Sequence, residues 1–164
     1  MKQKLSDEDK ELFLEERREL CLHTRLKQTE DHRQHGITSV YHHCCAVAAV
    51  SLALARRYRI PVDARSLVRG ALLHDYFLYD WHEAPGKHKL HGFTHPKTAL
   101  RNAMRDTGLN EIEKDIIIHH MFPLTPIPPK SREGMLVCTA DKICAAKETM
   151  EGLARVISLR RIFE

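Results

Sequence analysis

Apolar residues recur along this chain at the three- and four-residue intervals of helices, and the alternation that marks β-strands is nearly absent. A highly charged stretch follows Ser6, whose hydroxyl can cap a first turn rich in acidic residues. It predicts a long helix to about Lys27. A far more apolar stretch follows Thr38 or Ser39, either of which can cap it, and predicts a helix to about Tyr58.

Caps and breaker residues indicate the remaining helices. These are expected after Asp63, over about 96–106, 110–120 and 131–150, and as a short helix at the C-terminus. Thr94 can cap the helix that begins at Pro96, since proline is favoured at a first helical position. Asn110, with Glu113 three residues later, has the spacing of a capping box. The segment 122–130 holds four prolines and cannot continue a helix.

The expected fold is therefore all-α, a single-domain helical bundle of six to eight helices. A length of 164 residues fits one domain, and a hydrophobic content of 43% is enough to build a buried core. Within this single domain (1–164), residues 1–35 are assigned to an N-terminal helical extension, 36–148 to the core, and 149–164 to a C-terminal helix.

Charge and cysteine content narrow the function classes. A formal charge of +4 suits a small anionic substrate but lacks the basic stripe of a protein that binds nucleic-acid polymers. Five cysteines without a CxxC pair are typical of reduced thiols, so a cytoplasmic location is expected, and the charged N-terminus shows no signal segment. Residues 37–55 lack Asp, Glu, Lys and Arg, yet their two histidines and Ala-rich bulk favour a buried helix and no membrane contact. A homodimer is compatible with the sequence.

Four polar sites interrupt segments that an all-α core should fill with apolar side chains. They are His43, the pair His74–Asp75, the pair His119–His120, and Asp141. An unpaired carboxylate in such surroundings is costly, and a divalent cation removes the cost because neutral imidazoles and ionised carboxylates are its natural ligands. A set of nitrogen and oxygen donors without thiolate favours Mn, Fe, Ni or Mg over a thiolate-rich zinc site.

The order His43, His74–Asp75 and Asp141 resembles the H…HD…D signature of the HD-domain metal-dependent phosphohydrolase superfamily. The resemblance covers about residues 36–147 and includes the contexts GALLHDYFLYDWH and CTADKICAAK. It implies an all-α fold in which these four residues hold a divalent metal. His42 competes for the first position, and Val47, in phase with the apolar residue of the family, favours His43.

Two further segments resemble the added ligands of dinuclear members of this superfamily. They place His95 in HGFTHPKTAL and the pair His119–His120 in IIIHHMFPLTP. Periodicity alone does not choose within the pair, and similar sequences that carry the histidine directly before Met favour His120. The resemblance then implies one ion on His43, His74, Asp75 and Asp141, and a second, bridged by Asp75, on His95 and His120. The expected cofactor is one or two divalent ions of Mn, Fe, Ni, Mg or Zn.

The resemblance also implies an activity: hydrolysis of a phosphate ester or anhydride of a small molecule, such as a nucleotide or dinucleotide, with Asp75 at the catalytic centre. In the loop-like segment after Tyr79, Lys87 or Lys89 is expected to contact a substrate phosphate, and His82 or His91 to assist proton transfer. Two alternatives stay open at this point. One is a diiron oxygenase on the same scaffold, and the other is a non-catalytic sensor of a metal or nucleotide.

Overall fold

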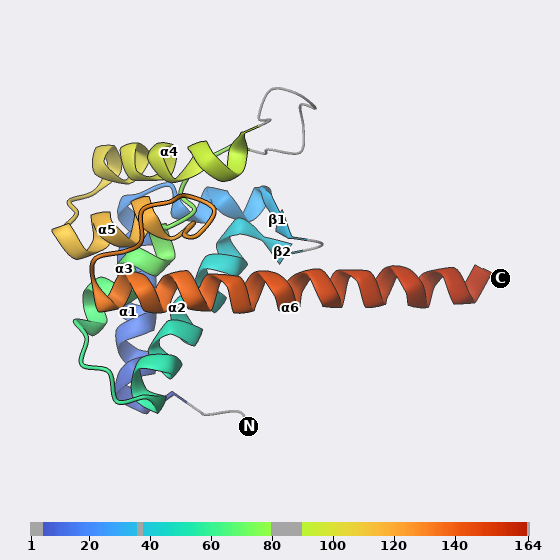
Figure 1. Ribbon diagram of the computed structural model, residues 1–164, viewed down its shortest axis with the longest axis horizontal. Coiled ribbons are helices and arrows are strands. Elements are labelled where there is room, and N and C mark those ends of the chain that lie inside the picture. The colour runs from blue at the N-terminus through green and yellow to red at the C-terminus, as the bar shows by residue number, and fades with distance from the viewer. Residues whose placement is uncertain (1–4, 36–37, 80–89, 164) are drawn as a thin grey trace.

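The structure, a computed structural model, describes residues 5–35, 38–79 and 90–163, apart from the side chains of His35 and of 154–163. Over these ranges it contains seven helices and two very short strands (Figure 1). The helices are α1 (Asp7–His23), the 3₁₀ helix η1 (Leu26–Asp31), α2 (Val40–Arg57), α3 (Ala64–Leu73), α4 (His91–Asp106), α5 (Glu111–His119) and α6 (Arg132–Phe163). The strands β1 (Arg33–His35) and β2 (Thr38–Ser39) pair antiparallel. The predicted all-α bundle is confirmed.

Four predicted helix starts are confirmed because each depends on a local hydrogen bond. The side chains of Ser6, Ser39, Asp63 and Asn110 each accept a backbone N–H from the first turn of the helix that follows. Glu113 completes the box at the last of these by accepting from the backbone N–H of Asn110.

The end of α1 and the start of α4 differ from the prediction. α1 ends at His23 and gives way to η1, so the expected helix to Lys27 is too long. α4 begins at His91, and Pro96 lies within it. The hydroxyl of Thr94 bonds to the carbonyl of Leu90, as a residue already inside a helix does, and therefore caps nothing.

A single helix, α6, replaces the two that were expected after Ser131. It runs unbroken from Arg132 to Phe163, and its C-terminal part extends beyond the other helices (Figure 1). The expected break near Met150 has no residue to cause it, because residues 140–163 contain no proline and only one glycine, Gly152. The C-terminal helix assigned to 149–164 is thus a continuation of α6 within the described residues.

The core lies where α2, α3, α5 and α6 meet. α2 packs against α3 and α6, and α5 packs against α3, α4 and α6. α3 is the most enclosed helix: seven of its ten residues are buried, including Leu67, Leu72 and Leu73. His74 and Asp75 follow its last residue directly, so the fold places both in the interior. No helix of the described residues is long and apolar enough to cross a bilayer.

Helix α1 is held to this core by ion pairs of a buried carboxylate. Glu16 is fully buried and pairs with Arg65 at 2.7 Å and Arg69 at 3.3 Å, both on α3. Arg69 continues to Glu113 of α5 at 2.8 Å. Because removal of one partner of a buried ion pair leaves an uncompensated charge, this network fixes α1 against α3 and α5.

The close approach of α3 and α5 requires a glycine. A Cβ at Gly70 would collide with the Cδ1 of Ile116 and stand 3.1 Å from its Cβ and Cγ2. Ile116 lies on the same short helix that ends at His119 and leads into His120. Gly70 therefore permits the close packing of α3 and α5, whose C-terminal ends lead into His74, Asp75 and His120.

We expect Gly70→Ala to lower the free energy of unfolding by about 1–2 kcal/mol. Overpacking costs about 1–3 kcal/mol, which exceeds the gain of up to about 1 kcal/mol from alanine in a helix. Gly108→Ala is the matched control, since a Cβ there meets nothing within 4 Å. Urea denaturation of both variants checks this, and equal stability of Gly70→Ala and the wild type would contradict it.

Candidate metal centre

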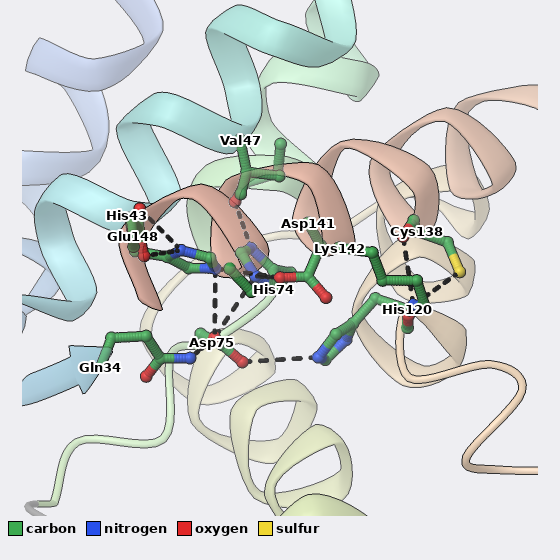
Figure 2. Close-up of polar contacts among 12 residues, drawn as sticks. Gln34, His43, Val47, His74, Asp75, His120, Cys138, Asp141, Lys142 and Glu148 are labelled. Carbon is green, nitrogen blue, oxygen red and sulfur yellow. Dashed lines mark hydrogen bonds and ion pairs between the residues drawn. The ribbon is translucent and has the colours of Figure 1, made fainter. Parts of the chain in front are cut away.

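Five helices bring six histidine and aspartate side chains to one buried point. α2 contributes His43, the end of α3 His74 and Asp75, α4 His95, the end of α5 His120, and α6 Asp141. None of the six is more than 8% exposed. Figure 2 shows His43, His74, His120 and Asp141 gathered around Asp75.

The two carboxylate oxygens of Asp75 face two different pairs of histidines. Its Oδ2 lies 3.4 Å from the Nε2 of His74 and 4.0 Å from the Nε2 of His43. Its Oδ1 lies 3.1 Å from the Nε2 of His95 and 3.4 Å from the Nε2 of His120. Asp75 thus stands between two groups of donors, one on each oxygen.

Asp141 joins only one of these groups. Its Oδ1 is 3.0 Å from the Nε2 of His43 and 3.8 Å from the Nε2 of His74. We name His43, His74, Asp141 and the Oδ2 of Asp75 the first half-site. The second half-site is His95, His120 and the Oδ1 of Asp75, and its two Nε2 atoms are 2.9 Å apart.

Hydrogen bonds on the far side of each ring turn Nε2 toward the cluster. The Nδ1 atoms of His74, His95 and His120 lie 2.7–2.8 Å from the backbone oxygens of Ala71, His91 and Ile117. A carbonyl only accepts, so each Nδ1 carries the hydrogen and each Nε2 offers a lone pair when the ring is neutral. The Nδ1 of His43 is 3.0 Å from a carboxylate oxygen of Glu148. This arrangement is typical of histidines that bind metals.

The histidines and carboxylates of the cluster shift one another's pKa values. Burial disfavours the imidazolium of His74, but the adjacent charge of Asp75 outweighs burial and raises the pKa of His74 well above its usual value. Burial disfavours the imidazolium of His43, but its hydrogen bonds to Asp141 and Glu148 outweigh burial and raise its pKa to about 10. Burial likewise opposes ionisation of Asp75, yet the adjacent His74 and His95 hold its pKa well below the usual range. Burial lowers the pKa of His120. The carboxylates are therefore ionised and attract positive charge, from protons or from a cation.

Two buried atoms in this cluster make no hydrogen bond, although each lies near an oppositely charged group. The Nε2 of His74 is 3.4 Å from the Oδ2 of Asp75, and the Oδ1 of Asp75 is 3.1 Å from the Nε2 of His95. Leaving a buried polar atom unpaired costs about 1–3 kcal/mol. The donor atoms of His43, His74 and Asp141 lie within 4.8 Å of one another, as do those of His74, Asp75 and His120. Each of these two groups could hold a divalent ion, and the nitrogen and oxygen donors fit such an ion. Bound ions would give the Nε2 of His74 and the Oδ1 of Asp75 the partners that they lack.

The structure brings together the favoured member of each ambiguous histidine pair. His43 is fully buried, whereas the side chain of His42 is 61% exposed and bonds to Ser39. His120 faces Asp75, whereas the Nδ1 of His119 lies 2.8 Å from the Oδ1 of Asp115.

Of the residues expected to assist chemistry, His91 lies beside the cluster. Its ring stacks on that of His95 with centroids 4.6 Å apart, and its Nδ1 is 3.0 Å from the hydroxyl of Tyr79. Its backbone oxygen also orients His95. His82, Lys87 and Lys89 lie outside the described residues.

Sequence reasoning missed two side chains that contact the cluster. Gln34 of β1 donates a hydrogen bond from Nε2 to the Oδ2 of Asp75, and Figure 2 shows it approaching from the side of the strand. No local pattern identifies Gln34, because its partner is 41 residues away. Glu148 had a signal: it follows Asp141 by seven residues, two helical turns, and therefore lies on the same face of α6.

The fold and this cluster define a helical protein with a buried His/Asp centre of the kind that binds divalent metals. The family model of the HD domain matches residues 40–146, which is more than half of the chain. The protein belongs to the HD domain family, part of a superfamily of metal-dependent phosphohydrolases. Searches of curated proteins and of solved structures gave no significant match.

The adjacent histidines provide a matched test of the second half-site. We expect His120→Ala to weaken the binding of one Mn²⁺ ion by at least about tenfold, since it removes a donor that faces Asp75. His119→Ala, which removes a neighbour of Asp115, should retain the stoichiometry of the wild type. Equilibrium titration with Mn²⁺ on folded protein counts the ions. Loss of an ion in His119→Ala, with none lost in His120→Ala, would reverse the assignment.

Proposed function

We propose that this protein is a metal-dependent phosphohydrolase that cleaves a phosphate ester or anhydride of a small molecule, with a nucleotide or dinucleotide as the substrate class. The observation that carries the proposal is the position of Asp75. One buried carboxylate presents separate oxygens to two sets of histidines, whose far nitrogens are each hydrogen-bonded to protein groups. Asp75 and the two sets of histidines would hold two divalent ions, and a pair of ions is the arrangement that this geometry supports best.

Two divalent ions at such a site lower the pKa of a bound water and polarise a phosphoryl oxygen, which supplies both the nucleophile and the charge stabilisation. The residues of the chain would hold the ions, and they orient the histidine rings. Asp75 joins the half-sites, and Asp141 adds a second carboxylate to the first. The backbone oxygens of Ala71, His91 and Ile117 keep three rings from rotating. The six side chains are almost fully buried, and the exclusion of bulk water strengthens the electrostatic interactions among them.

The residues proposed for proton transfer and phosphate binding are His91, at the start of α4, and three residues that precede it in the sequence. His91 stacks on His95 and bonds to Tyr79, which holds an imidazole next to the second half-site. We propose that His91 or His82 assists proton transfer by donating a proton to the leaving oxygen, and that Lys87 or Lys89 binds a substrate phosphate. A mildly basic chain, at +4, suits such an anionic substrate.

Phosphate release from a panel of nucleotides, dinucleotides and sugar phosphates tests the proposal. With Mn²⁺ added, we expect release from at least one member, and a loss of at least about 100-fold in Asp75→Asn, which keeps shape but removes the shared charge. Such a loss corresponds to about 2.7 kcal/mol of transition-state stabilisation.

Asp7→Asn is the matched control, because Asp7 is an almost fully exposed carboxylate in the first turn of α1. Its activity should equal that of the wild type. Folded, metal-loaded protein that releases no phosphate, or that shows the spectrum of a mixed-valent diiron centre with oxygen-dependent chemistry instead, would contradict the proposed function.

A further inference from the structure

The two half-sites differ in charge and in what supports their histidines. The first half-site contains Asp141 in addition to Asp75, and the Nδ1 of its His43 meets the carboxylate of Glu148 at 3.0 and 3.2 Å. The second half-site has only its share of Asp75, and both of its histidines bond to neutral backbone oxygens. Three carboxylates thus surround the first half-site, and one serves the second.

Glu148 adds to the charge difference between the half-sites through its contact with one imidazole ring, that of His43. Its side chain is 9% exposed, and His43 is fully buried, so little water screens the contact between them. His43 is held at both nitrogens by carboxylates of one helix, Nε2 by Asp141 and Nδ1 by Glu148 (Figure 2). A carboxylate on Nδ1 fixes the ring orientation and makes Nε2 a stronger electron donor than a carbonyl partner does.

We propose that Glu148 is a positioning residue that makes the first half-site the tighter of the two, so that the centre fills in a fixed order: first half-site, then second. Glu148 lies just outside the segment matched by the HD domain family, which ends at 146. The inference rests on the proposed metal centre. It concerns the order and strength of metal binding and does not depend on which substrate is cleaved.

Titration of the metal-free protein with Mn²⁺ alone tests this order, with free Mn²⁺ followed by electron paramagnetic resonance. The wild type should show two classes of site. Glu148→Gln keeps an oxygen that can accept from Nδ1 but removes the charge, and we expect it to weaken the tighter class by about 10–100-fold. The weaker class should change less than twofold. Glu148→Ala, which removes the hydrogen bond as well, should lose at least as much affinity.

Glu151→Gln is the matched control, because Glu151 lies three residues further along α6 with its side chain 67% exposed. It should bind Mn²⁺ as the wild type does. Glu148→Asp keeps the charge and provides a second variant, with an expected affinity between those of Glu148→Gln and the wild type. Melting of each metal-free variant separates a loss of folding from a loss of metal affinity.

The outcomes distinguish this inference from the proposed function. Equal weakening of both classes, no weakening in any Glu148 variant, or a single class in the wild type would overturn the order of filling, whether or not phosphate is released. A selective loss in Glu148→Gln would support it even if every phosphorylated compound of the panel proved inert.

Discussion

The structure depends on the burial of one carboxylate. Asp75 is 2% exposed and ionised, and it sits directly after the most enclosed helix of the bundle. An ion in such a place is tolerated only with close partners of opposite charge or with a metal. Four histidines from α2, α3, α4 and α5 surround it. The charge of Asp75 is therefore compensated only when these four helices are packed together.

The C-terminal ends of α3 and α5 orient two of the histidines that surround Asp75. A helix leaves its last carbonyls without intrahelical partners, and these usually turn to water or to caps. At the end of α3 the oxygen of Ala71 accepts from His74, and at the end of α5 the oxygen of Ile117 accepts from His120. Each histidine therefore satisfies a terminal carbonyl with Nδ1 while Nε2 faces Asp75. At each of these two helix ends, a single hydrogen bond satisfies a terminal carbonyl and also orients a histidine.

How much the sequence could predict follows from the range of each interaction. Helix starts at Ser39 and Asp63 were predictable because a cap bonds within three residues. The start of α4 at His91 was not predictable, since its N-cap Leu90 makes no side-chain hydrogen bond and Pro96 indicated a later start. The convergence of His43, His74, Asp75 and Asp141 could be inferred from their order and from polar intrusion into apolar helices. Gln34 could not, because only the folded chain brings β1 to Asp75.

The unbroken helix α6 places two carboxylates, Asp141 and Glu148, against the same histidine. Asp141 and Glu148 are separated by two turns, about 10 Å along the axis, and both reach the ring of His43 because they share one face of the helix. Had the helix ended near Met150, Glu148 would lie in its last turn, where helices fray. Continuation to Phe163 places Glu148 in the interior of the helix, held by backbone hydrogen bonds on both sides. The extension of α6 beyond the bundle thus steadies the carboxylate that orients the first histidine of the site.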